Sequence, residues 1–198
     1  MKEKIIILGA GRGQVPLINI CKEYGLETIV ISVDGDYPGF SIADKTYKVD
    51  VKDKESVLSI AKDEGVIGIV TTAVEVAVPT AAWVSDRLQL PSIGYPVSLK
   101  FRNKHIMRQE AEKVGIDVPK YSATSSIEEA TSLAEKIGYP LVIKPVDSSS
   151  SRGVFKIQNN DELILYFNES IKHSSLKEVL IEEFVSGQEY IVEAFTNN

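Results

Sequence analysis

The chain has 198 residues, 43% of them hydrophobic and 25% charged, which is the composition of an ordinary globular protein of one or two domains. A formal net charge of −6 argues against a nucleic-acid partner, because phosphate backbones are held by basic surfaces. A single cysteine, Cys21, excludes an internal disulfide framework, and the four consecutive aliphatic residues near the N-terminus are too few for a signal peptide or a membrane span, so we expect a cytoplasmic protein with no membrane partner.

The first half of the sequence alternates short aliphatic runs with helical patterns. We predict strands at residues 5–8, 28–32, 47–49 and 67–71, and helices at residues 14–24, 54–64 and 76–88. Aliphatic strands separated by helices are typical of a parallel sheet that is covered on both faces. The pattern therefore predicts a Rossmann-like α/β domain over residues 1–97.

After Pro91 and Pro96 the pattern changes. A helical segment at residues 99–114 is followed by a predicted strand at 120–123, a helix at 127–137, strands at 141–146 and 154–157, a helix at 161–172, and strands at 179–183 and 189–195. Ser125 or Ser126 is placed to cap the helix that begins at residue 127. This order predicts an α+β lobe with its own sheet over residues 98–198.

A glycine-rich turn, Gly9-Ala-Gly-Arg-Gly-Gln14, follows the first predicted strand and opens a helix. Backbone N–H groups and the helix dipole can accept an anion at such a turn. The dinucleotide-binding fingerprint requires a third glycine where Gln14 stands, although Asp34 follows the second strand at the distance of the ribose-binding acid. NAD binding stays open here, and a substrate-binding or structural turn is the preferred interpretation.

Other polar residues of the first domain also follow predicted strand ends, where open α/β sheets bind their ligands. The segment at residues 34–44 is one example, although turn formation explains it nearly as well. An acid after the fourth strand is another. The candidate substrate-binding residues are Gly11, Arg12, Gln14, Asp34 and Glu75.

In the second half, Lys144 stands inside an apolar strand and is followed at once by a loop of hydroxyl groups and backbone donors. An ammonium group among Leu, Val and Ile is costly to bury unless an anion compensates it. The alternative is an edge-strand lysine whose ammonium group reaches solvent. We interpret Lys144 and the loop as a phosphate site; the loop residues are Ser148, Ser149, Ser150, Ser151, Arg152 and Gly153.

A second apolar run ends in Glu182 and Glu183, and Glu189 follows beyond a Ser186-Gly187 turn. Side chains alternate along a strand, so only one of the two adjacent acids can face inward. We choose Glu182 as the inward acid.

Taken in order, these segments resemble the ATP-grasp superfamily, whose members hold ATP between two lobes and usually join a carboxylate to an amine through an acyl phosphate. Lys104, in Phe101-Arg-Asn-Lys-His-Ile-Met-Arg108, resembles the first ATP lysine of the family, and Lys144 resembles the second. Without this resemblance Lys104 would be assigned to a solvated basic helix face. The loop at residues 148–153 resembles the flexible phosphate loop of the family.

The same resemblance assigns roles to the acidic segment. It implies that Glu182 takes the adenine amino group, that the backbone of Glu183 and Val185 meets the ring edge, and that Glu189 takes the ribose hydroxyls. It covers nearly the whole chain, because the Rossmann-like first domain is also a feature of the family.

The resemblance implies ATP and Mg²⁺ as cofactors and small-molecule carboxylate and amine substrates, and it allows a homodimer. Two lysines and a donor-rich loop would offset phosphate charge while the substrate carboxylate attacks the γ-phosphorus, and no residue of the chain is assigned a catalytic role. The metal ligands of the family lie on later strands, beyond Asn198, so we expect none within this chain. We expect an incomplete ATP-grasp lobe that is inactive by itself.

Two functions therefore remain from the sequence. One is an ATP-dependent carboxylate–amine ligase, or its N-terminal part, similar to the purine-biosynthesis, carbamoyl-phosphate synthase and biotin carboxylase branches of the superfamily. The other is a noncatalytic nucleotide- or NAD-binding module that uses the turn at residues 9–14.

Overall fold

The structure, a computed structural model, describes residues 2–192. The chain forms two compact units, Met1–Arg102 and Asn103–Asn198, each with its own sheet and its own core. Within the described residues no helix is both long enough and apolar enough to cross a membrane.

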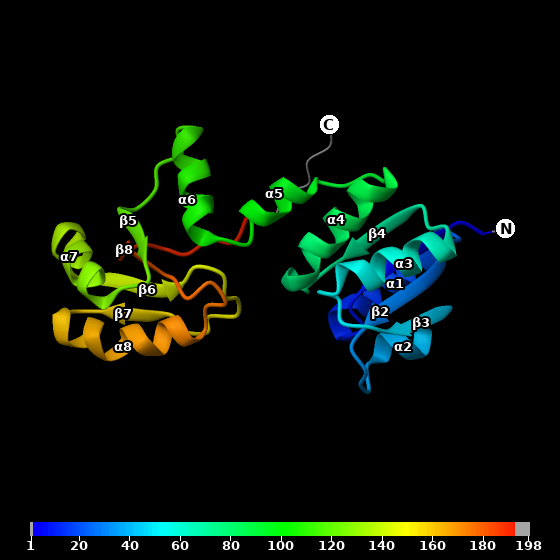
Figure 1. The fold of residues 1–198 in the computed structure, drawn as a ribbon, viewed down its shortest axis with the longest axis horizontal. Coiled ribbons are helices and arrows are strands. Elements are labelled where there is room, and N and C mark those ends of the chain that lie inside the picture. Colours follow the sequence, from blue (N-terminus) through cyan, green and yellow to red (C-terminus); the bar gives the residue numbers. More distant parts are fainter. Residues whose placement is uncertain (1, 193–198) are drawn as a thin grey trace. The chain divides into compact units, whose positions relative to one another are not determined.

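The first unit is built on a parallel four-stranded sheet in the order β3-β2-β1-β4 (Figure 1). Its strands are β1 (Lys4–Leu8), β2 (Glu27–Ser32), β3 (Lys45–Lys48) and β4 (Gly68–Thr71). In the register of the sheet Ile6 lies beside Ile29 on one side and Ile69 on the other. The parallel sheet predicted from the aliphatic runs is therefore confirmed.

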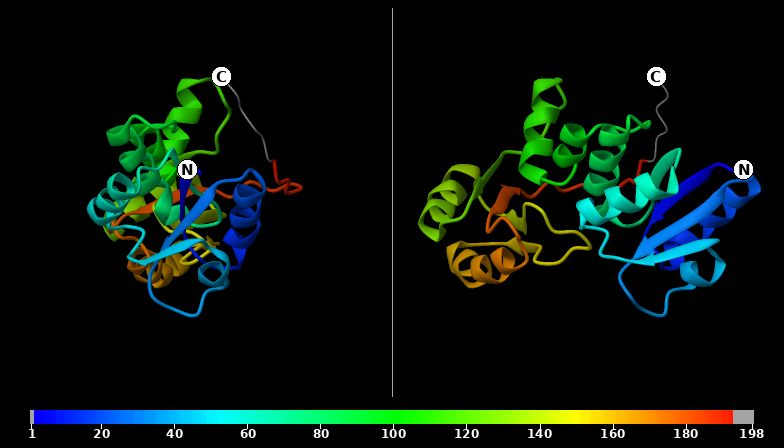
Figure 2. Two further views of the ribbon diagram at one scale, coloured as in Figure 1. Left: turned by 90° about the vertical axis from the view of Figure 1, so that its right-hand side faces the viewer. Right: turned by 45° about the vertical axis from the view of Figure 1, so that its right-hand side comes forward.

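Helices cover both faces of this sheet (Figure 1 and Figure 2). They are α1 (Val15–Glu23), α2 (Pro38–Ile42), α3 (Lys54–Glu64) and α4 (Val78–Leu88), with short 3-10 turns at Arg12–Gln14 and Glu75–Ala77. A further helix, α5 (Tyr95–Lys100), packs against α4. Ile6 faces the core formed with α3 and α4, whereas Ile7 faces the core formed with α1, because side chains alternate along a strand. Cys21 is buried in this second core, where burial raises the pKa of its thiol.

The second unit is built on an antiparallel four-stranded sheet in the order β5-β8-β6-β7. Its strands are β5 (Tyr121–Thr124), β6 (Leu141–Pro145), β7 (Phe155–Ile157) and β8 (Val179–Glu183), and its helices are α6 (Lys104–Lys113), α7 (Ile127–Ile137) and α8 (Asn160–Lys172). Helices α7 and α8 pack on one face, over a core that includes Ile143, Ile181 and Phe167. The α+β fold of this half is confirmed, and Ser126 is the residue that caps α7, accepting from the amide of Glu129.

Three expectations about individual elements were wrong. The single helix at residues 99–114 is two helices, because the Asn103 side chain caps α6 by accepting from the amides of His105 and Ile106. No helix was expected at residues 34–44, where α2 begins with Pro38 at the first helical position, at which its missing N–H costs no hydrogen bond. The predicted strand at 189–195 is not a strand over 189–192, and its last three residues lie outside the described residues.

A buried carboxylate lies at the end of α3 in the first unit. Glu64 is 9% exposed, and one carboxylate oxygen accepts from the Lys4 ammonium at 2.8 Å. The other oxygen accepts from Lys45 and from the Tyr47 hydroxyl. These three donors lower the pKa of Glu64 to about 2. The Glu64 carboxylate therefore links β1, β3 and α3 through its hydrogen bonds to Lys4, Lys45 and Tyr47.

Candidate functional site

Lys144 and Glu182 meet on the sheet face opposite α7 and α8. Lys144 lies beside Leu180 in the register of β6 and β8, so Glu182, two residues further along β8, is its diagonal neighbour on the same face. The Lys144 ammonium donates to Oε1 of Glu182. The two side chains are only 16% and 9% exposed, so the pair is largely removed from water. Glu182 is the inward acid, as its place in the strand predicted, whereas Glu183 is exposed.

Arg108, on α6, completes this cluster. Its Nε and Nη2 atoms both donate to Oε2 of Glu182, at 3.1 and 3.0 Å. Two cations thus share one carboxylate, and the three side chains together carry a formal charge of +1. An excess positive charge in a half-buried place favours an anionic ligand, because attraction between charges is stronger where water is excluded.

Lys104, at the start of the same helix, reaches the serine loop. Its ammonium donates to the backbone carbonyl of Ser148, and its own amide donates to the carbonyl of Val146 at 2.8 Å. Lys104 and Arg108 are four residues apart, so both project from one side of α6. The structure therefore places Lys104 against the serine loop and Lys144 in the adjacent strand, β6.

The serine loop is anchored at its base by Asp147. Its carboxylate accepts from the Ser174 hydroxyl at 2.7 Å and from the amide and hydroxyl of Ser175. Burial acts to raise the pKa of Asp147, but these hydrogen bonds outweigh it and hold that pKa below its usual range. The loop is thus fixed at one end by Asp147, and both oxygens of its carboxylate already accept hydrogen bonds.

The rest of the loop turns back on itself. Ser150 and Ser151 have left-handed backbone conformations, and Arg152 donates from its side chain to the carbonyl of Ser149 at 3.3 Å. Gly153 has φ +72°, and a Cβ there would lie 3.0 Å from atoms of Pro145 and His173, so only glycine fits without strain. Residues 150–152 are exposed and accessible to a ligand.

The remaining predicted contacts in this unit lie outside the cluster. Glu183, Val185 and Glu189 are exposed, and the amide of Glu183 pairs with the carbonyl of Lys120 within the sheet region.

Sequence reasoning did not select Arg108, which was assigned only to a basic helix face. The signal available in the sequence was its position one helical turn after Lys104, which puts both cations on the same side of the helix. His105 is half-buried against Tyr121, with the two ring centroids 5.7 Å apart.

In the first unit the glycine-rich turn is filled by Gln14. This side chain is buried; its carbonyl oxygen accepts from the Gly11 amide at 2.9 Å and its amide donates to the carbonyl of Thr72. A donor that a bound pyrophosphate would use is therefore already paired, and Pro16 at the start of α1 offers none. Gly39 of α2 lies against Ala10, where a Cβ would come within 2.7 Å of the Ala10 carbonyl oxygen. The arrangement favours the structural interpretation of this turn over a dinucleotide site.

The other candidate substrate residues follow the carboxyl ends of β1, β2 and β4. Arg12 and Glu75 are exposed in the two 3-10 turns. Asp34 forms an exposed ion pair with Lys48 at 2.7 Å, and that ammonium lowers the pKa of Asp34. β1 and β4 are the pair at which the strand order of the sheet reverses, and open α/β sheets bind ligands at that edge. These residues therefore lie at the edge of the sheet where ligands bind, and they supply both positive and negative charges.

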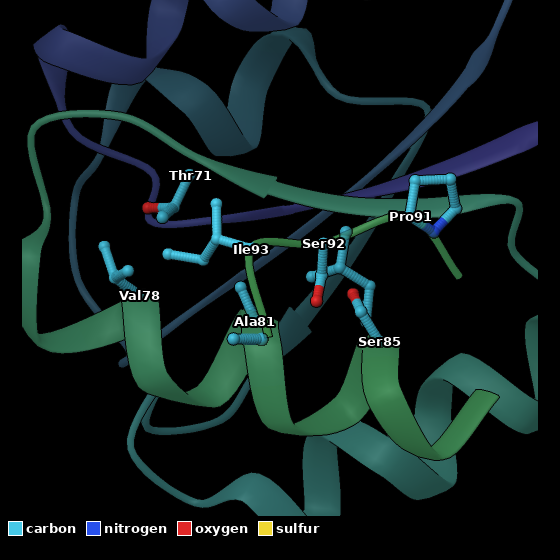
Figure 3. Close-up of a pocket in the computed structure, with 9 residues that line it drawn as sticks. Thr71, Val78, Ala81, Ser85, Pro91, Ser92 and Ile93 are labelled. Atoms are coloured by element: carbon cyan, nitrogen blue, oxygen red, sulfur yellow. The ribbon is translucent and has the colours of Figure 1, made fainter. Parts of the chain in front are cut away.

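A separate pocket of about 230 Å³ lies between α4 and the segment that follows it (Figure 3). Its walls are mainly aliphatic, with Ile69, Val78 and Ile93 among them, and no lining residue is charged. The hydroxyl of Ser85 is buried there without a hydrogen-bond partner. A phosphate or a carboxylate would find no compensating charge in this pocket.

Within residues 2–192 no group of three or more His, Cys, Asp or Glu side chains is placed to hold a metal ion.

Comparisons with known proteins show which family the chain resembles. The family model described as D-ala D-ala ligase C-terminus matches residues 111–198. The formate-dependent phosphoribosylglycinamide formyltransferase of Wolinella succinogenes is 31% identical over 185 residues, which cover 92% of this chain and 48% of that protein. The chain thus spans about half the length of the curated relatives it matches.

Solved structures show the same fold. The biotin carboxylase domain of a 2-oxoglutarate carboxylase from Hydrogenobacter thermophilus, a dimer in complex with MgADP, ADP and bicarbonate, matches 93% of this chain and 45% of that chain, with a TM-score of 0.77 and 22% identity. The N5-carboxyaminoimidazole synthetase of Staphylococcus aureus, complexed with ADP, matches 93% of this chain and 48% of that chain, with a TM-score of 0.78 and 15% identity.

These solved structures share the arrangement of a parallel α/β unit followed by an α+β unit over 93% of this chain. The resemblance to the ATP-grasp superfamily that the sequence indicated is therefore confirmed, over about half the length of these relatives.

Proposed function

We propose that the chain is the ATP-binding part of a ligase that activates a carboxylate as an acyl phosphate for attack by an amine. The observation that carries the proposal is the cluster on the second sheet, where Lys144 and Arg108 share the single carboxylate of Glu182 beside the serine loop. The relatives named above, two of them solved with ADP, support this function over a noncatalytic NAD-binding module. So does the turn filled by Gln14.

Within this function, different residues of the second unit bind different parts of the nucleotide. Lys104, Lys144 and the loop at 148–153 hold the phosphates, and Glu182 receives the adenine amino group on Oε1, the oxygen to which Lys144 donates in this structure. The backbone of Glu183 and Val185 meets the ring edge, and Glu189 takes the ribose hydroxyls. ATP supplies the phosphoryl group, while the side chains of this chain bind, orient and offset charge.

The acid and amine substrates bind at the edge of the first sheet. We propose that exposed Arg12, Asp34 and Glu75 contact them, because these residues follow the ends of strands β1, β2 and β4. Gly11 and Gln14 contribute by shaping the turn that carries Arg12. We further propose a cytoplasmic protein, which fits its single unpaired cysteine, and a homodimer as its assembly.

The direct test is ligand binding by the 198-residue chain. Isothermal titration and thermal shift with Mg-ATP, ATP alone and NAD are compared at equal concentrations. Mg-ATP is expected to raise the melting temperature and NAD to leave it unchanged. Stabilisation by NAD but not by ATP would overturn the proposal in favour of the dinucleotide module.

The loop at residues 148–153 is expected to become ordered when ATP binds. Residues 150–152 are exposed, and the Arg152 amide reaches the Ser149 carbonyl only at 3.5 Å, so phosphate would supply stronger acceptors for the loop. Hydrogen exchange followed by mass spectrometry, with and without Mg-ATP, measures this as slower exchange of the loop peptide in the complex. Equally strong protection in both states would contradict a phosphate-binding loop.

We propose that the 198 residues alone do not turn over. The described residues supply no cluster of acids for Mg²⁺, and the chain spans about half the length of its relatives. Release of ADP, measured with mixed carboxylate and amine substrates, is expected to stay at the background rate. Turnover that depends on Mg²⁺ would show that the metal site is complete within this chain.

A further inference from the structure

Arg108 holds Glu182 from the side opposite Lys144. Both of its contacts fall on Oε2, whereas Lys144 occupies Oε1. The Arg108 side chain is 32% exposed and Glu182 is 9% exposed, so the arginine reaches in from the rim to a carboxylate that is nearly buried. The two cations therefore do not compete for the same oxygen.

This division of the carboxylate matters when Lys144 changes partner. If the Lys144 ammonium turns to a phosphate, Glu182 loses its Oε1 partner. A buried carboxylate without a partner is strongly unfavourable. With Arg108 on Oε2, Glu182 keeps a charge partner and Lys144 can leave. Without Arg108, Glu182 would retain Lys144.

The position of Arg108 is fixed by the packing of α6. Asn103 caps the first turn, and His105 lies edge-on against the ring of Tyr121. Tyr121 in turn donates from its hydroxyl to Glu112 at 2.6 Å. Contacts on the same side of α6, before and after Arg108, thus hold the helix against β5, the strand next to β8.

We propose that Arg108 is a positioning residue of the nucleotide site, which keeps Glu182 compensated so that Lys144 is available to phosphate. This inference rests on the proposed function for its consequence in ATP binding. Its immediate effect, on how firmly Glu182 holds Lys144, does not require nucleotide.

The first experiment measures that effect without nucleotide. The acetylation rate of Lys144 by an amine-reactive ester is compared with that of exposed Lys136 in the same protein, by mass spectrometry. Arg108→Met is expected to lower the relative rate several-fold, because Glu182 then holds the ammonium alone. Arg108→Met combined with Glu182→Gln is expected to restore it. A merely structural role would raise the rate by loosening the sheet.

The second experiment measures Mg-ATP affinity. Arg108→Met is expected to weaken binding about tenfold, and Arg108→Lys to recover part of the loss. In the Arg108→Met background, Lys144→Met should cost much less than it does alone. Lys113→Met, an exposed change on the same helix, is the control and should bind as the unchanged chain does.

The outcomes separate the two proposals. If the unchanged chain does not bind Mg-ATP, the proposed function fails and the acetylation result still decides the role of Arg108. An unchanged or raised Lys144 rate in Arg108→Met overturns the positioning role. Additive losses for Arg108→Met and Lys144→Met in ATP binding overturn it as well.

Discussion

Lys144→Met is expected to weaken Mg-ATP binding about ten- to a hundredfold, because a hydrogen bond to a charged group contributes about 1.5–3 kcal/mol. The fold should survive. The variant keeps the aliphatic stem within β6, and Arg108 remains as the partner of Glu182, so no buried carboxylate is left alone. Titration calorimetry for affinity and thermal unfolding for stability, on the same preparations, separate the two effects.

Lys136→Met is the matched control for this variant. Lys136 belongs to the same unit and lies exposed on α7, on the sheet face opposite the cluster. It should change neither affinity nor melting temperature. If Lys144→Met binds Mg-ATP as tightly as the unchanged chain, the phosphate assignment of Lys144 is wrong, whatever the fold resemblance.

The second large effect is on the stability of the first unit and on how that stability depends on pH. Glu64→Gln is expected to lower the free energy of unfolding of the first unit by about 2 kcal/mol near pH 7, a figure reduced to allow for solvent around the partly exposed lysines. The pKa of Glu64 is about 2 in the folded protein and 4.5 in its ordinary state. The contribution is therefore fully present above about pH 4.5 and is lost as the pH falls through 2.

Trp83 reports this unfolding selectively. It is the only tryptophan of the chain and is buried in the core of the first unit. Urea unfolding followed by its fluorescence at several pH values should show the difference between the unchanged chain and Glu64→Gln shrinking between pH 4.5 and 2. Asp63→Asn, an exposed change one residue earlier, is the control. A difference that persists undiminished at pH 2 would mean that packing, and not the carboxylate charge, accounts for the effect.

The elements of both sheets could be predicted from the sequence, because local patterns specify them. Runs such as residues 5–8 and 179–181 are too aliphatic to be exposed, and in the first half their separation by helical patterns indicates parallel pairing. The inward orientation of Glu182 likewise followed from alternation along one strand. The break between α5 and α6 was equally local, since Asn103 is a standard capping residue, but the helical pattern across it was interpreted as continuous.

The charge partners could not be predicted in the same way. Glu64 is 60 residues from Lys4, and Arg108 is 74 residues from Glu182, so nothing in the local sequence relates them. Gln14 is a similar case: its identity departed from the dinucleotide fingerprint, yet only the fold shows its side chain turned back onto Gly11 and Thr72. By itself the sequence determined a parallel α/β unit, an α+β unit and a lysine directed toward an anion, because periodicity and the cost of burying charge act locally. Only the tertiary structure decided which carboxylate holds that lysine and which arginine shares it, because electrostatic contacts depend on proximity in space and not along the chain.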